Sequence, residues 1–181
     1  IKPKNDFIYG LRSLCSKYNS LLIFDEVMTG YRVSHGGAQE FLKVDPDITT
    51  LGKVIGGGLP VGAYGGKNEI MSHISPEGPI YQAGTLSGNP VSMSAGIAML
   101  KQLQNKDVYD YLNEITNYLA NGLKEVSEKN NYPLIVNSYC SMVGIFCTNV
   151  DVNNYKDITQ TCVSNYNKLH KYFLENNIYS E

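Results

Sequence analysis

The stretch DITTLGKVIGGGLPVGAYGG, residues 47–66, begins like an apolar strand, carries one lysine, Lys53, and continues into three consecutive glycines. After Asp47 no other side chain in the stretch is charged. An unpaired ammonium group costs free energy to remove from water, so a lysine among small and apolar residues indicates a chemical use, with a solvated loop lysine as the alternative. The glycines at 56–58 favour the chemical use, because such a run marks backbone that approaches a neighbour closely or takes positive φ angles.

Two phosphate-binding motifs fail on the same stretch. A Walker loop needs a glycine five residues before its Gly-Lys pair and a serine or threonine after it, and this chain has Asp47 and Val54 at those positions. A dinucleotide-binding frame that starts at Gly56 and Gly58 meets Val61 where it needs a third glycine. Nucleotide binding therefore loses its main support.

An acidic residue stands at the end of a second strand-like run. The apolar segment LLIFDEV, residues 21–27, is typical of a strand buried on both faces of a parallel sheet, and its carboxylates occur only at the C-terminal end. Open α/β sheets bind ligands at the carboxyl ends of their strands. The chain between the two runs is long enough for a crossover connection, so we expect Asp25 and Lys53 to converge on one crevice.

The remaining patterns predict an α/β protein in two parts. Residues 1–105 are typical of part of a large domain with a mainly parallel sheet, and residues 106–181 of a smaller, incomplete α+β domain. Near residue 105 glycine becomes sparse, and Asn, Lys and Tyr become common. The periodicities predict, in chain order, a helix over 6–18, strands over 47–53 and 61–66, helices over 68–73 and from near Asn89, then a helix over 107–129, strands over 134–138 and 142–148, and a helix over about 157–176.

Composition and charge argue against several classes of partner. The net charge of -2, with acidic and basic residues interspersed, gives no reason to expect nucleic acid or an anionic membrane surface, and no run approaches the roughly 20 apolar residues of a membrane span. The four cysteines form no CxxC pair and the three histidines lie far apart, so we expect a reducing compartment and no metal site. We also expect the sequence to be a fragment, because Ile1 is not a start residue.

An acid and an amine at neighbouring strand ends have one well-known joint use. A lysine amine forms a Schiff base with pyridoxal phosphate (PLP), and a carboxylate keeps the pyridine nitrogen protonated so that the ring accepts electrons from a substrate carbanion. With Lys53 and Asp25 in these roles, the free amine would act as a base in a desolvated site. We therefore predict a PLP site at this edge of the sheet.

Three segments together resemble a known family. They are LLIFDEVMTGYRVSHGGAQEF (21–41), PDITTLGKVIGGGLPVGAYGG (46–66) and GPIYQAGTLSGNPVSMSAGIAML (78–100). Over nearly its whole length the chain resembles the class III aminotransferases, PLP-dependent enzymes of fold type I. The segments RVSHGGAQ and YQAGTLSGNP are more specifically similar to the glutamate-1-semialdehyde aminomutases of that family.

The resemblance implies roles for three residues at the strand ends. Lys53 is the Schiff-base lysine, Asp25 pairs with the pyridine nitrogen, and Val27 packs against one face of the cofactor ring. For Asp25 the alternative is a carboxylate that caps the following turn, and for Val27 it is ordinary core packing. Glu26 points to the opposite side of an extended backbone, so we expect it to be structural.

The resemblance also implies a contact between subunits. Gly84 and Thr85 reach the cofactor phosphate of the neighbouring subunit, in a homodimer whose sites are shared. A helix N-cap formed by Ser87 or Asn89 is compatible with this role. The family's cis phosphate loop, stacking aromatic ring and mobile lid are not in this sequence, and no motif gives a role to Arg32, His35 or Gln39.

The implied activity is that of an isomerase in tetrapyrrole (porphyrin) biosynthesis. It converts one small-molecule substrate, glutamate 1-semialdehyde, to 5-aminolevulinate, with the cofactor passing through its pyridoxamine phosphate form. The resemblance implies a cytoplasmic enzyme, or a plastid one in a photosynthetic eukaryote. Two alternatives stay open: a class III ω-aminotransferase that uses a 2-oxo acid acceptor, and a non-catalytic dimerising module, since this segment alone is expected to be inactive.

Overall fold

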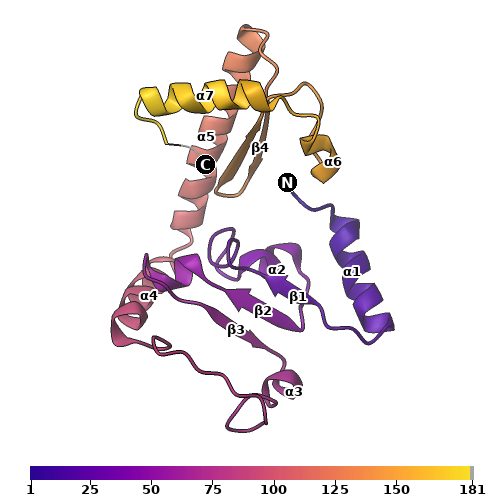
Figure 1. Ribbon diagram of the computed structural model, residues 1–181, viewed down its shortest axis with the longest axis vertical. Coiled ribbons are helices and arrows are strands. Elements are labelled where there is room, and N and C mark those ends of the chain that lie inside the picture. Colours follow the sequence, from indigo (N-terminus) through magenta and orange to yellow (C-terminus); the bar gives the residue numbers. More distant parts are fainter. Residues whose placement is uncertain (180–181) are drawn as a thin grey trace. The chain divides into compact units, whose positions relative to one another are not determined.

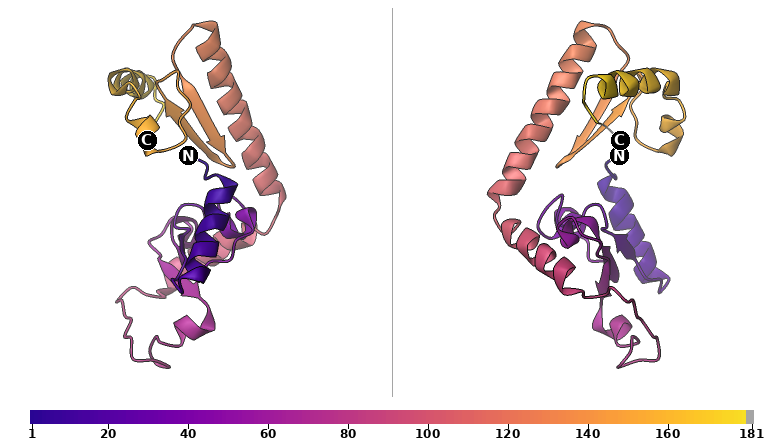
Figure 2. Two further views of the ribbon diagram at one scale, coloured as in Figure 1. Left: turned by 90° about the vertical axis from the view of Figure 1, so that its right-hand side faces the viewer. Right: turned by 60° about the vertical axis from the view of Figure 1, so that its left-hand side comes forward.

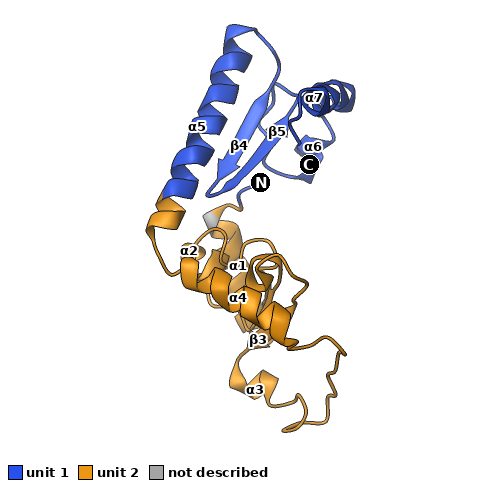
Figure 3. Ribbon diagram, turned by 90° about the vertical axis from the view of Figure 1, so that its left-hand side faces the viewer, with its two compact units in different colours: residues 1–2, 111–181 blue, residues 3–110 orange. Residues whose placement is uncertain are grey.

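The computed structural model describes residues 1–179, apart from the side chain of residue 5. Its contacts divide the chain into two compact units, residues 3–110 and residues 1–2 with 111–181 (Figure 3). The sequence interpretation put a boundary at residue 105, and its assignment of a cofactor domain before that point and a small C-terminal domain after it stays a prediction. None of the helices within residues 1–179 is long and apolar enough to cross a membrane.

The 3–110 unit is built on a three-stranded sheet in the order β1 (Ile23–Asp25), β2 (Ile48–Leu51) and β3 (Ala63–Gly66) (Figure 1). β1 runs parallel to β2, whereas β3 runs antiparallel to it, so this part of the sheet is mixed. The connections explain the difference. The chain crosses over between β1 and β2 through α2 (Gly37–Leu42), but between β2 and β3 it forms only a short 3-10 turn, η1 (Lys53–Gly56), and folds back.

Only one face of β1 is covered. Leu22 and Glu26 are buried, whereas Leu21 and Ile23 are each 55% exposed. The expectation that residues 21–27 are buried on both faces is therefore wrong for the described chain. The reason is that no element within residues 1–179 packs over the face that carries Leu21 and Ile23.

A buried carboxylate closes the N-terminal end of the parallel strand pair. Asp47 precedes β2, and its side chain accepts a hydrogen bond from the Leu22 backbone N–H at 2.7 Å. It forms ion pairs with Arg12 of α1 (Asn5–Lys17) at 2.7 Å and with Lys67, which follows β3, at 2.5 Å. These donors, the Leu22 N–H first and then Lys67 and Arg12, hold the pKa of the Asp47 carboxyl well below its usual range.

The glycine run packs against a long helix, α4 (Pro90–Gln102). Gly57 has a positive φ of 58°, and a Cβ built on it would collide with the Ala95 carbonyl oxygen. A Cβ on Gly96 would collide with the Ile55 carbonyl oxygen. The expected close approach at the glycine run is confirmed: the backbones of η1 and α4 touch with no side chain between them.

The rest of the chain forms a hairpin with helices on both sides. In the 111–181 unit β4 and β5 pair antiparallel and lie between α5 and α7 (Figure 2). Ala120, Val136 and Cys147 are buried in its core. The elements are α5 (Asp107–Lys129), β4 (Ile135–Tyr139), β5 (Met142–Phe146), α6 (Tyr155–Ile158) and α7 (Val163–Glu175), while the remaining short helix of the other unit is α3 (Asn68–Met71).

The last predicted helix is interrupted. Instead of one helix over about 157–176, the chain forms α6 and α7. Asn154 and Asp157 form a capping box that starts α6. The chain then leaves the helix, and the Cys162 backbone N–H donates to the Cys147 carbonyl at 2.9 Å before α7 begins. The single-helix expectation was wrong because this long-range backbone bond leaves no periodic signal in the sequence.

Candidate functional site

The carboxyl ends of β1 and β2 lie side by side. Asp25 is in register with Thr50 of the neighbouring strand, and the Thr50 hydroxyl donates to Asp25 Oδ1 at 3.3 Å. Lys53 follows Thr50 by three residues, directly after the end of β2. The predicted acid and the segment that carries the predicted amine therefore meet at one edge of the sheet.

Asp25 is exposed, and its two carboxylate oxygens differ. Oδ1 accepts the Thr50 hydroxyl and, at 3.0 Å, the Val27 backbone N–H, so the turn-capping interaction considered from the sequence is present. Within residues 1–179 no hydrogen bond is made to Oδ2. One oxygen thus fixes the orientation of the carboxylate, and the other is available to a ligand.

Val27 lies against the start of the lysine segment. Its Cγ atoms are 3.2 and 3.6 Å from the position that a Cβ on Gly52 would occupy. Gly52 is buried and Val27 is half-buried. The missing side chain at Gly52 therefore lets Val27 sit directly beside the residue that precedes Lys53.

Lys53 has a strained backbone. Its φ is 44°, in the left-handed region, which costs a residue with a Cβ about 1–2 kcal/mol. The side chain is exposed among the described residues, and the desolvated site expected around the free amine stays a prediction. Lys43, which ends α2, also has a positive φ, of 54°, so the backbone angle by itself does not distinguish Lys53 from a loop lysine. Lys53 begins η1, and the residues that follow it contact α4 through Ile55 and Gly57.

Glu26 is buried on the opposite side of β1, with 1% of its surface exposed. Its Oε2 accepts the Thr29 hydroxyl at 2.6 Å and the Ala38 backbone N–H at 2.7 Å. Its Oε1 accepts the Gln39 backbone N–H at 2.8 Å and the Gln39 side-chain amide at 3.4 Å. The structural role expected for Glu26 is confirmed, but no sequence pattern indicates its partners, which lie up to 13 residues away.

Two of the three residues without a motif, His35 and Gln39, lie near this carboxylate. A hollow of about 250 Å³ is lined by Glu26, His35, Gln39 and neighbouring residues. The His35 ring meets the Tyr31 ring edge-on, with 5.4 Å between their centres. His35 and Gln39 therefore belong to the segment 29–39 beneath the strand ends.

Gly84 and Thr85 lie in an exposed segment, residues 81–88. Gly84 helps to line a hollow of about 490 Å³ together with the stretch 60–62. In the described chain neither residue contacts Asp25 or Lys53 through a hydrogen bond. Asn89 caps α4 by accepting the Ser92 backbone N–H at 3.0 Å, so of the two N-cap candidates it is Asn89 that caps the helix.

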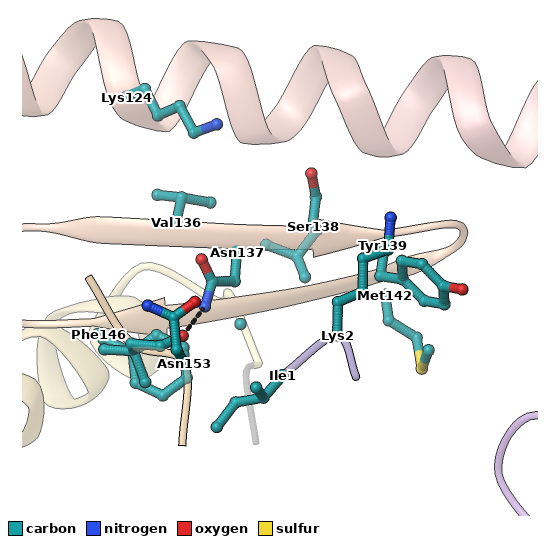
Figure 4. Close-up of a pocket in the computed structure, with 13 residues that line it drawn as sticks. Ile1, Lys2, Lys124, Val136, Asn137, Ser138, Tyr139, Met142, Phe146 and Asn153 are labelled. Carbon is teal, nitrogen blue, oxygen red and sulfur yellow. Dashed lines mark hydrogen bonds between the residues drawn. The ribbon is translucent and has the colours of Figure 1, made fainter. Parts of the chain in front are cut away.

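One hollow of the 111–181 unit contains none of the five predicted site residues. It measures about 450 Å³, and Figure 4 shows Lys124 of α5 and Ser138 of β4 pointing into the space between helix and hairpin. Lys2 Nζ lies 5.4 Å from the centre of the Tyr139 ring. Across the described residues, 1–179, no group of three or more His, Cys, Asp or Glu side chains could hold a metal ion.

Residues 1–168 match the family described as Aminotransferase class-III. The chain belongs to this family. The family match and the likeness to a solved aminotransferase confirm the fold type I architecture expected from the sequence. Asp25 and Lys53 therefore lie at neighbouring strand ends in a chain of this family.

Three individual proteins show how similar this chain is to members of the family and how much of their length it covers. A glutamate-1-semialdehyde 2,1-aminomutase from Wigglesworthia glossinidia brevipalpis is 52% identical over 176 residues, which cover 97% of this chain and 40% of the relative. A β-phenylalanine aminotransferase from Variovorax paradoxus has a TM-score of 0.92 and 31% identity, covering 100% of this chain and 42% of its own. A transaminase with PLP bound has a TM-score of 0.87 and 27% identity, covering 99% of this chain and 42% of its own. This class-III chain thus spans about two fifths of the length of these relatives.

Proposed function

We propose that the complete protein is a PLP-dependent glutamate-1-semialdehyde 2,1-aminomutase. The observation that carries the chemistry is the position of Lys53 just after β2, next to the strand end that carries the partly unbonded carboxylate of Asp25. The identity of 52% to an aminomutase supports the choice of glutamate 1-semialdehyde as substrate and 5-aminolevulinate as product.

The described residues fit PLP chemically. Asp25 would hold the protonated ring nitrogen with Oδ2, since its Oδ1 already bonds Val27 and Thr50. Val27 would pack on one face of the ring, next to the buried Gly52. The Lys53 amine would bind the aldehyde carbon covalently.

In this proposal the residues act in turn. When bound, PLP supplies a protonated pyridine ring that stabilises negative charge on a substrate carbon and a position that carries the amino group. Asp25 keeps the ring nitrogen protonated through its negative charge. Lys53 Nζ, once released, takes a proton from one substrate carbon and returns it to another. Both amino-group positions belong to the same substrate, so no oxo acid is consumed.

We propose that Gly84 and Thr85 bind the cofactor phosphate of a second subunit in a homodimer. The segment is exposed and precedes the 13-residue helix α4, whose N-terminal end favours an anion. The Gly84 N–H and the Thr85 hydroxyl are suitable donors for phosphate oxygens.

We further propose a cytoplasmic location, which suits the four free cysteines of the described chain.

The test is an assay of the purified complete protein with glutamate 1-semialdehyde and no added oxo acid. We expect 5-aminolevulinate to accumulate, at a rate that an added 2-oxo acid does not raise. The likeness to an ω-transaminase from Sphaerobacter thermophilus, 32% identical over 99% of this chain, makes an ω-aminotransferase the second candidate. A strict requirement for an oxo acid would support that candidate and contradict the aminomutase proposal.

A further inference from the structure

The Glu26 carboxylate makes an unusual set of contacts for a buried acid. All four of its hydrogen-bond donors are neutral: the Thr29 hydroxyl lies in the turn 29–36, and the other three belong to Ala38 and Gln39 in the first turn of helix α2. By contrast, the buried Asp47 at the other end of the strands is paired with two cations. The Glu26 carboxylate thus binds strand β1 to the segment 29–39 instead of neutralising charges.

This contact fixes the strand at the point where β1 stops. β1 has only three residues and pairs with one strand in the described chain. Beyond Asp25, the Glu26 backbone still bonds both sides: its N–H donates to the Thr50 carbonyl at 2.9 Å, and its carbonyl accepts the Gly30 N–H at 2.8 Å. The buried side chain completes this anchor.

The buried Glu26 side chain determines which way its two neighbours, Asp25 and Val27, point. In extended backbone successive side chains point to opposite faces, so burying Glu26 sends Asp25 and Val27 to the open face. Burial indeed alternates, from exposed Asp25 to buried Glu26 to half-buried Val27. The segment 29–39 is packed closely beneath, where a Cβ on Gly30 would lie 2.5 Å from Leu51 Cδ2.

We propose that Glu26 is a positioning residue for the cofactor, which sets the orientation of Asp25 and Val27 through its bonds to the segment 29–39. The inference rests on the proposed function, because it assigns the ring to these two side chains. Glu26 touches neither cofactor nor substrate itself. It acts through its two neighbours in the chain.

The test uses Glu26→Gln in the complete protein. Gln has nearly the same shape, but its NH₂ group must face a backbone N–H of Ala38 or Gln39, so one acceptor becomes a donor. We expect a PLP affinity about tenfold weaker, because a bond of this kind is lost beside the site. We also expect a changed circular dichroism of the bound cofactor, since that signal reports the orientation of the ring.

Two further variants separate positioning from general stability. Asp47→Asn weakens the same strand pair at its other end, and it should lower the melting temperature while leaving the affinity and the cofactor signal unchanged. Thr29→Val removes one hydroxyl donor and leaves the carboxylate intact, so it should give a smaller change of the same kind. Should Glu26→Gln not fold, Thr29→Val decides the question alone.

Hydrogen exchange in the protein without cofactor gives an independent readout. The Ala38 and Gln39 amides should exchange faster in Glu26→Gln than in the parent. Unchanged affinity and dichroism in Glu26→Gln, or an equal change in Asp47→Asn, would overturn the positioning role. A parent protein that binds no PLP would instead defeat the proposed function, and the exchange rates at residues 38 and 39 would still report whether the anchor exists.

Discussion

Both ends of the β1–β2 pair carry charged residues, but those at one end are paired around a buried carboxylate, whereas those at the other are exposed and, among the described residues, unpaired. At the N-terminal end Asp47 is 4% exposed and bonded to two cations and a backbone N–H. At the C-terminal end Asp25 and Lys53 are exposed, and within residues 1–179 neither takes part in an ion pair. Charges that are paired inside the fold serve stability, whereas charges held in place but left unpaired are available to a ligand.

The largest expected effect comes from removing the amine at the open end. Lys53→Ala in the complete protein should lower turnover by about three orders of magnitude or more, because the covalent attachment and the proton-carrying base are lost together. The visible absorbance of lysine-bound cofactor should disappear. Lys67→Ala, at the closed end, is the matched control and should keep that absorbance. Near-normal turnover in Lys53→Ala would contradict the role of Lys53 as the cofactor-binding lysine and base.

Asp25→Asn should lower turnover by about a hundredfold. The amide oxygen still accepts the Val27 N–H and the Thr50 hydroxyl, so local structure is kept while the negative charge is lost. Steady-state kinetics and a melting curve measure the two effects separately. We expect the melting temperature to change little. A variant as active as its parent would mean that the ring nitrogen has another partner.

Asp47→Asn should act on stability alone, lowering the free energy of unfolding by about 2 kcal/mol. The pKa of the folded carboxyl is depressed, so its contribution is present above the unfolded pKa of about 4 and is lost as pH falls below that value. Denaturant unfolding at several pH values should show parent and variant converging in acid. A difference that stays constant down to pH 2 would contradict the ion-pair explanation.

The smallest expected effect is that of Thr85→Val, with a PLP affinity about tenfold weaker. If Thr85 serves the other subunit, mixing Lys53→Ala chains with Thr85→Val chains gives heterodimers with one doubly damaged and one intact site. At a PLP concentration too low to load Thr85→Val homodimers, activity should then return on mixing, up to one site per heterodimer. Tagged chains and gel filtration verify exchange. Heterodimers without recovered activity would place the phosphate contact within one chain.

Local patterns carried much of the fold. The helix over 107–129 was predicted with its observed ends, because its apolar residues repeat with helical spacing and solvent covers its other face. The interruption between α6 and α7 was not predictable, since it depends on a bond between residues 147 and 162. The exposed face of β1 was missed for a related reason: an apolar run does not say whether a covering element is present.

For the site, too, features with a local sequence pattern could be predicted, and features without one could not. The positions of Asp25 and Lys53 followed from a run of apolar residues, a glycine run and a family resemblance. The left-handed backbone of Lys53 did not follow, because no residue pattern in this segment indicates a positive φ at a lysine. The partners of Glu26 were equally hidden, since two of its four bonds come from backbone N–H groups, which no side-chain pattern encodes.

The contact between η1 and α4 has an evolutionary consequence. Gly57 and Gly96 each fill a position where a single methyl group would meet a carbonyl oxygen of the opposing segment. Neither can change to a larger residue unless the helix moves away, and that movement would shift η1, the segment that begins with Lys53. Descendants of this sequence that keep the lysine should therefore keep both glycines, whereas a lineage that abandons the chemistry is free to lose them together.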